Sequence, residues 1–207
     1  MGCGWTPSVE IDYSHVQAVE AANGLDAETP FSGIGFWQKL LNRGFHVTAI
    51  GGSDNHNAPL PAGSAGAIGT PTTVIYADAL SESAIVAGIK RGRVFIDLAG
   101  TRDRALDLAA STGKQVAQIG DTLVARRGAF IRFRGRVDAV AGGEVQVLLD
   151  GERVPWLKDS RLDSAAESFD FEWRADGKRH WVRLDVRDAD GHLALLGNPI
   201  YITPPGH

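Results

Sequence analysis

The stretch Ile50–Asn57 (IGGSDNHN) decides how the first half of the chain is interpreted. It follows the apolar run Val47–Ile50 and precedes a loop rich in Gly, Ala and Pro, so the pattern predicts a strand that ends in a polar site. In extended backbone, residues two apart project to the same side, and Asp54 and His56 would therefore point at one spot. A carboxylate and an imidazole so placed can share a metal ion. The alternative is a turn in which Asp54 binds its own backbone and His56 lies on the surface.

The composition is that of an ordinary globular protein. The 207 residues are 43% hydrophobic and 22% charged, which suffices for one large or two small domains. The net charge of -4 and the absence of a local Lys/Arg cluster argue against a nucleic-acid partner. No apolar run approaches the roughly 20 residues that span a bilayer, and no signal-peptide pattern occurs, so we expect a soluble protein without a membrane partner.

The N-terminus raises a separate question. Met1–Thr6 formally matches an N-myristoylation pattern, but the residues after it resemble domain interior, so the chain is expected to begin inside a domain. Cys3 is the only cysteine, which excludes an intramolecular disulfide and a cysteine-based zinc site.

Residues 1–102 predict strands that alternate with helices, the pattern of a parallel α/β sheet or barrel. In the first unit, a strand at Val16–Glu20, a helix containing Phe36–Leu41 and the strand Val47–Ile50 follow one another. The second unit repeats this order with a strand at Thr72–Tyr76, a helix from Ser81 and a strand at Val94–Ile96.

Residues 103–207 change to a period of two. Apolar and polar residues alternate in four segments, and three Asp-Gly dipeptides provide hairpin turns. The segments are 131–138, 145–149, 169–173 and 181–187, and the dipeptides lie at 150–151, 176–177 and 190–191. This predicts an immunoglobulin-like antiparallel β-sandwich.

Five segments in the first half form an ordered series: Val19–Gly24, Phe36–Gly44, Gly52–His56, Pro71–Ala77 and Ile89–Phe95. In this order they resemble the C-terminal half of PHP (polymerase and histidinol phosphatase) domains, with the CehA/McbA-like branch of metallohydrolases as the nearest match. The resemblance implies a distorted (β/α)7 barrel that holds up to three metal ions. It also implies hydrolysis of phosphoesters, or of esters and carbamates, by a metal-activated water.

The same resemblance implies roles for particular residues. The family's Ser-Asp-x-His motif corresponds to Ser53–His56, which makes Asp54 and His56 ligands of a divalent metal such as Zn, Mn or Fe. Four polar residues remain as possible further contacts to the metal ligands or the substrate: Glu20, Asn23, Ser53 and Asn55. No catalytic residue can be assigned. The family's early His-x-His motif, its middle Asp-His and Glu motifs and its later His-Pro motif are missing. The chain is therefore expected to be a fragment or mis-started copy of a longer enzyme, or a degenerate relative whose remaining function is not catalysis.

Two functions follow from these patterns. The first is a metal-dependent hydrolase of a small ester or phosphoester, incomplete in this chain. The second is a non-catalytic remnant that acts as a binding or oligomerisation module through its β-sandwich, with homo-oligomers as one outcome. A sugar-binding sandwich would rest only on Trp156, Trp173 and Trp181, for which positions in the core are the simpler interpretation.

Overall fold

The computed structural model describes residues 11–24, 26–64 and 66–206. Met1–Thr6 and Cys3 lie outside the described residues. The chain divides into two compact units, Met1–Thr101 and Arg102–His207. Within the described residues, no helix is both long enough and apolar enough to cross a membrane.

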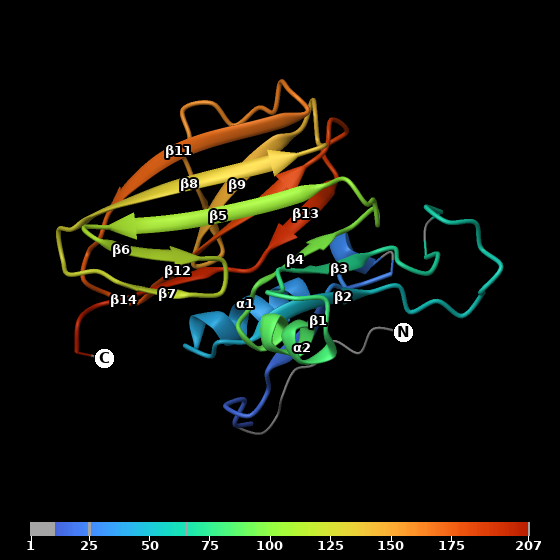
Figure 1. Ribbon diagram of the computed structural model, residues 1–207, viewed down its shortest axis with the longest axis horizontal. Coiled ribbons are helices and arrows are strands. Elements are labelled where there is room, and N and C mark those ends of the chain that lie inside the picture. Colours follow the sequence, from blue (N-terminus) through green and yellow to red (C-terminus); the bar gives the residue numbers. More distant parts are fainter. Residues whose placement is uncertain (1–10, 25, 65, 207) are drawn as a thin grey trace. The chain divides into compact units, whose positions relative to one another are not determined.

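Unit 1 combines two strand pairs with two α-helices (Figure 1). Its elements, in chain order, are β1 (Ala18–Asn23), the 3-10 helix η1 (Asp26–Glu28), α1 (Ile34–Asn42), β2 (Thr48–Gly52), β3 (Thr72–Ile75), α2 (Glu82–Lys90) and β4 (Val94–Asp97). β1 and β2 are parallel, whereas β3 and β4 are antiparallel. The parallel arrangement is possible because η1 and α1 carry the chain back between β1 and β2.

Helix α1 packs through one apolar stripe. Trp37, Leu40 and Leu41 are buried at i, i+3 and i+4, the spacing of one helix face. The indole N–H of Trp37 donates a 2.7 Å hydrogen bond to the carbonyl oxygen of Val47, which ties the helix to the start of β2. The side chain of Thr73 in β3 binds both the N–H and the carbonyl oxygen of Gly51, at 2.8 and 2.7 Å.

The prediction of a PHP-type (β/α)7 barrel is wrong. The described part of unit 1 has one parallel strand pair and two α-helices, and the expected second β-α-β unit is an antiparallel pair. The N–H of Tyr76, just after β3, donates to the carbonyl oxygen of Arg93, just before β4. Helix α2 therefore returns the chain to the end where β3 stops, and β4 must run in the opposite direction to β3.

Unit 2 is an all-β unit. Its strands are β5 (Ala105–Thr112), β6 (Gln115–Gln118), β7 (Thr122–Val124), β8 (Phe130–Asp138), β9 (Glu144–Leu149), β10 (Glu152–Val154), β11 (Ala166–Arg174), β12 (His180–Arg187), β13 (Leu193–Gly197) and β14 (Ile200–Thr203). One sheet is antiparallel with the order β11-β8-β5-β6. In the other, β10, β9, β12 and β13 follow in order, β14 also pairs with β12, and β7 runs parallel to β14.

The core of unit 2 lies between these two sheets. Along β8, Ile131, Phe133 and Val137 are buried while the arginines between them are exposed. Gly135 occupies the inward position between Phe133 and Val137, where an added Cβ would lie 2.2 Å from the ring of Phe169. The glycine therefore makes room for that aromatic ring.

Strand β12 differs from the expected alternation because Trp181 through Val186 are all buried. Arg183 is 1% exposed and forms a bidentate pair with Asp185, at 2.8 and 2.9 Å. The guanidinium also lies over the Trp181 ring at 5.5 Å. Burial of this pair is possible because the two hydrogen bonds replace part of the lost hydration.

Candidate functional site

The polar residues predicted as a site lie where β1 and β2 end. Asn23 donates a 3.0 Å hydrogen bond to the Glu20 carboxylate. The Glu20 carboxylate reaches the backbone of Gly52, where an added Cβ would lie 2.8 Å from it. Asn55 instead binds the carbonyl oxygen of Gly66 at 2.6 Å, which fixes the loop after β2. Ser53 is half-buried at the start of that loop.

Asp54 and His56 contact each other directly. The His56 Nε2 lies 3.2 Å from the Asp54 carboxylate, and their side chains are 86% and 58% exposed. Asp54 has a φ of 46°, so the backbone leaves the extended conformation at this residue. The two groups converge through a turn in the left-handed region, and both of them face solvent.

The described residues contain no group of three or more His, Cys, Asp or Glu side chains that could hold a metal ion. Without such a group, the structure does not support the metallohydrolase interpretation, that is, the predicted metal binding and phosphoester hydrolysis. That interpretation depended on the PHP resemblance, which the observed fold of unit 1 overturns.

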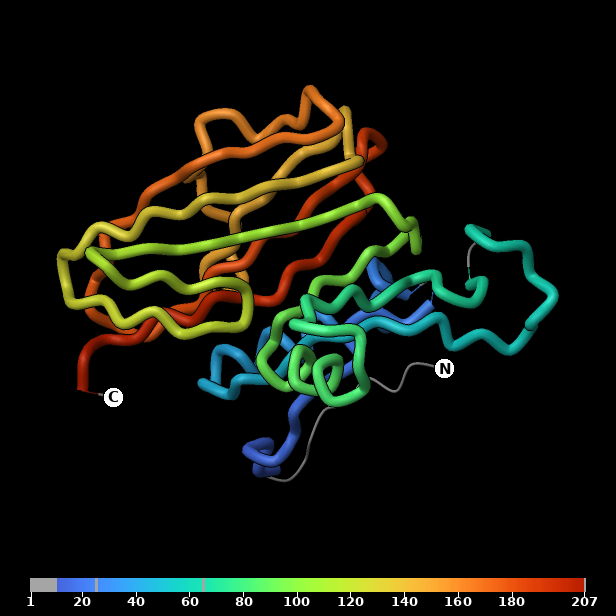
Figure 2. The backbone as a smooth tube through the Cα atoms, viewed as in Figure 1, coloured from blue at the N-terminus to red at the C-terminus, as the bar shows by residue number. Residues whose placement is uncertain are grey.

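A long loop between β10 and β11 covers one open edge of the sandwich. We call residues 155–165 the strap; Figure 2 shows it in orange. The Trp156 ring stacks on Trp173 with a centroid distance of 5.5 Å and an interplanar angle of 17°. It also lies near Phe133 and Phe171, which stack on each other at 4.7 Å. The strap is thus held by an aromatic side chain that fills the gap between the sheet edges.

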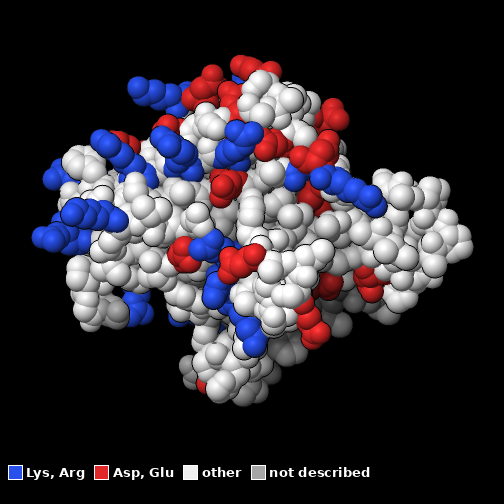
Figure 3. Space-filling model, viewed as in Figure 1, with Lys and Arg blue, Asp and Glu red and all other residues white. Residues whose placement is uncertain are grey.

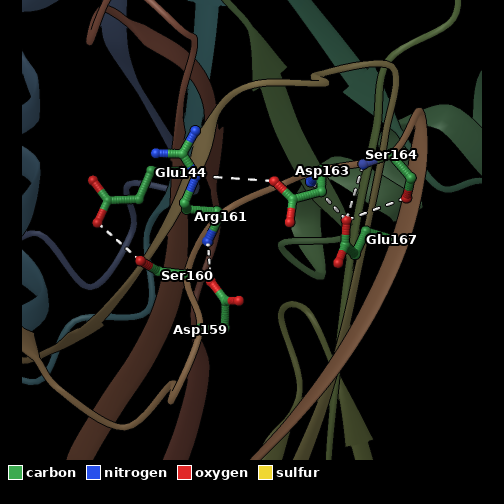
Figure 4. Close-up of polar contacts among 7 residues, drawn as sticks. All are labelled: Glu144, Asp159, Ser160, Arg161, Asp163, Ser164 and Glu167. Atoms are coloured by element: carbon green, nitrogen blue, oxygen red, sulfur yellow. Dashed lines mark hydrogen bonds and ion pairs between the residues drawn. The ribbon is translucent and has the colours of Figure 1, made fainter.

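Polar contacts hold the rest of the strap (Figure 4). Ser160 donates to Glu144, and the Glu167 carboxylate accepts hydrogen bonds from the backbone N–H groups of Asp163 and Ser164. Burial alone would raise the pKa of Glu144, but hydrogen bonds from Ser160 and Arg153 outweigh it and hold that pKa below its ordinary value of 4.5. The strap is consequently an ordered part of the sandwich.

A pocket of about 290 Å³ lies between the strap and β9. Its apolar lining comes from Val145, Val147, Val154, Pro155 and Leu157, and its polar lining from Arg153 and Ser160. Both polar side chains already bind Glu144. The pocket therefore offers an apolar surface whose polar groups are engaged within the protein.

The outer face of the β11-β8-β5-β6 sheet carries a ladder of paired charges. Arg132 and Arg134 contact Glu172 and Asp170 on the neighbouring strand, at 2.8 and 3.1 Å, and Arg136 contacts Asp138. In Figure 3, blue and red side chains lie interleaved on the upper part of the visible face. Each arginine of this ladder has its counter-ion, so the face is close to electrically balanced.

One end of the sandwich carries exposed cations in place of paired charges. Three connections meet there: the β5–β6 turn, the β7–β8 connection and the β11–β12 turn. We call their exposed cations, together, the basic end: Lys114, Arg126, Arg127, Lys178 and Arg179. None of the five forms an ion pair with another described residue. In Figure 3, blue side chains gather at the left-hand end of the sandwich.

The connections of the basic end are fixed to one another by backbone contacts. Gly128 donates to the carbonyl oxygen of Ala175, and Ala175 donates to that of Ala129. The turn glycine Gly177 lies against the side chain of Arg127, since an added Cβ there would be 2.9 Å from the arginine's Cβ. Cations that are distant in the sequence are therefore held side by side.

Apolar surface accompanies these cations. Phe130, the first residue of β8, is 62% exposed, and Arg174 lies over its ring at 5.5 Å. On β6, Val116 is exposed as well. By register, Val116 faces Ser111 and Ser111 faces Arg132, so the valine shares the outer face with the charged ladder. The basic end thus combines positive charge with aromatic and aliphatic contact area.

His180 lies at the base of this end. Its Nδ1 is 2.6 Å from Asp150 in the β9–β10 turn, and its Nε2 is 3.0 Å from Asp176 in the β11–β12 turn. Its ring makes a T-shaped contact with the Trp173 ring, with 5.1 Å between the two centroids. One imidazole consequently engages a carboxylate from each of these two turns.

Sequence reasoning missed the basic end and the histidine between two carboxylates. The cations lie singly or in pairs at positions 114, 126–127 and 178–179, so they form no cluster along the sequence. Asp150 and Asp176 were recognised only as the first residues of Asp-Gly turns, and the only further signal was a histidine at the start of the strand that follows the second turn.

Comparisons with known proteins add little. No protein-family model matches the chain, and no curated protein matches it. Among solved structures, the fibronectin(III)-like modules of Clostridium thermocellum CbhA are similar at 18% sequence identity, covering 47% of this chain and 97% of that one, with a TM-score of 0.30. A likeness with so low a TM-score carries no argument, so unit 2 is described from its own strand pairing.

Proposed function

We propose that the C-terminal sandwich is a non-catalytic binding module that recognises an acidic protein segment through its basic end. The observation that carries this proposal is the set of five exposed cations without an ion-pair partner among the described residues. Where charge serves folding alone, as on the neighbouring sheet face, each arginine has an acid beside it.

The chemistry of the patch favours a protein segment over a purely ionic polymer. Three of the five cations are arginines, whose planar guanidinium groups bind carboxylates through two parallel hydrogen bonds. Phe130 and Val116 add exposed apolar area that a chain of sugars and sulfates would leave unused. A segment that mixes acidic and apolar residues would use both kinds of contact.

The test is binding of a synthetic peptide of alternating Glu and Leu to the full chain, with the matching Gln and Leu peptide as control. We expect affinity that weakens as salt is added, because exposed charges are screened over about 10 Å at 0.1 M salt. The double variant Arg127→Glu, Lys178→Glu should lose most of this affinity. Lys158→Glu, an equally exposed cation on the strap, should retain it.

A variant and a matched control test the apolar contribution to peptide binding. Phe130→Ala should weaken peptide binding several-fold, whereas Phe31→Ala in unit 1, at 61% exposure, should leave it unchanged. If a sulfated polysaccharide binds as well as the peptide and Phe130→Ala has no effect, the patch is a general anion surface and the protein-segment proposal is wrong. Equal affinity for the Gln and Glu peptides would also refute it.

A further inference from the structure

Both ring nitrogens of His180 contact carboxylates, and this bears on the protonation of the imidazole. A neutral imidazole has one N–H and one lone pair, so it can donate to one carboxylate only. Here each ring nitrogen lies within hydrogen-bond distance of a different carboxylate, Asp150 at 2.6 Å and Asp176 at 3.0 Å. With one nitrogen unprotonated, a lone pair would face a carboxylate oxygen at one of these contacts, which is repulsive. Protons on both nitrogens satisfy both contacts.

The surroundings support this arrangement. The His180 side chain is 13% exposed, and Asp150 also accepts the backbone N–H of Trp181 at 3.0 Å. Burial would raise the pKa of Asp176, but hydrogen bonds from the Lys178 N–H and from His180 outweigh it and lower that pKa. Asp176 is consequently held as an anion.

The charged groups that face the imidazole come from two turns. The β9–β10 turn contributes Asp150, and the β11–β12 turn contributes Asp176 together with Lys178, which acts on Asp176 electrostatically. The Trp173 ring of β11 makes a T-shaped contact with the imidazole, and Ile202 of β14 is the neighbour of His180 across the strand pair.

We infer that His180, protonated on both ring nitrogens, is the positioning residue of the basic end. It fastens the β11–β12 turn, which carries Lys178 and Arg179, to the β9–β10 turn. It also engages the carboxylate of Asp176, which would otherwise compete with an acidic ligand for the same cations. Loss of one imidazole proton breaks the weaker contact, to Asp176, and frees both the turn and its negative charge.

This inference rests on the proposed function for its consequence, but its central statement can be tested without any ligand. Nitrogen-15 NMR of the full chain at about pH 7 should show both His180 ring nitrogens protonated. An unprotonated nitrogen at that pH would overturn the inference, whatever the peptide measurements show.

The binding test uses the alternating Glu and Leu peptide at about pH 5 and about pH 8. Wild-type affinity should fall about tenfold where the imidazole has lost one of its two protons, the order expected for a partly exposed hydrogen bond to a charged group. His180→Gln should bind weakly at both pH values, because glutamine cannot place two donors as the imidazolium does. His192→Gln, an exposed histidine in the β12–β13 turn, should retain the wild-type profile.

A second variant separates positioning from simple charge. In Asp176→Asn, the amide can donate to an unprotonated Nε2, so the turn stays fastened in both protonation states and the pH dependence should disappear with affinity retained. If wild type binds the peptide equally at both pH values, the inference is wrong while the proposed function stands. If wild type does not bind the peptide at all, the proposed function fails and the NMR result alone decides the inference.

Discussion

Replacing Trp156 by alanine tests whether the strap is a structural part of the sandwich. The ring is half-buried, so truncation loses roughly half of the 1.5–3 kcal/mol that full burial of a large side chain provides. Loss of the stacked contact with Trp173 adds about 1 kcal/mol. The expected decrease in the free energy of unfolding is therefore about 2 kcal/mol, below the roughly 3–5 kcal/mol of a fully buried Trp→Ala because the Trp156 ring is only half-buried.

The assay is urea unfolding of the full chain followed by circular dichroism. A double-mutant cycle with Trp173→Ala should give a coupling energy of about 0.5–1.5 kcal/mol, because the two rings contact each other. Phe31→Ala, an exposed aromatic in unit 1, should change stability by less than about 0.5 kcal/mol. A Trp156→Ala variant as stable as wild type, or a cycle without coupling, would show that the strap is not held by this stack.

Three further predictions follow from single features. Gly135→Ala should destabilise the chain by about 1–3 kcal/mol, because the new Cβ meets a phenylalanine ring. Gly35→Ala, inside α1 with open space around it, should stabilise the chain by about 0.5–1 kcal/mol. Urea midpoints that do not separate the two variants would contradict this. The pKa of Glu144 is lowered in the folded state, so its contribution is complete above the ordinary value of 4.5 and is lost as pH falls through the lowered native value; a Glu144→Gln variant with an unchanged stability profile below that pH would contradict it. Because Asp54 and His56 both face solvent, the Asp54→Ala, His56→Ala double variant should unfold within about 0.5 kcal/mol of wild type, and zinc or EDTA should leave both melting temperatures unchanged.

Alternating patterns predicted four of the ten sandwich strands that the structure describes, β8, β9, β11 and β12, because burial of one face leaves a period of two in the sequence. Along β8 the inward positions are apolar or glycine, and the outward ones are arginines. Strand β12 shows where this reasoning stops. Its Arg183 and Asp185 occupy alternate positions like residues of a solvated face, yet both are buried as a pair. A period of two separates the faces of a strand but does not reveal which face meets solvent.

The barrel prediction for unit 1 is wrong for a different reason. The strand and helix segments lie close to the predicted positions, but their order does not determine pairing direction. The close approach of Tyr76 and Arg93, which makes β3 and β4 antiparallel, depends on a turn after α2 that a hydrophobic pattern cannot specify. A short Asp-x-His motif had the same weakness. The two side chains do meet, yet the third ligand that would make them a metal site is missing from the described residues.

The distribution of charge is the strongest argument that the sandwich does more than fold. Unpaired like charges held together by backbone contacts repel one another, and this repulsion opposes folding. On the outer sheet face, Arg132 and Arg134 show that this chain places an acid beside an arginine on a regular strand pair. At the basic end the two nearby acids, Asp150 and Asp176, are both engaged by His180. Apart from the attraction of Lys178 to Asp176, these cations face solvent, so the binding of an acidic segment, as proposed, would relieve the repulsion among them.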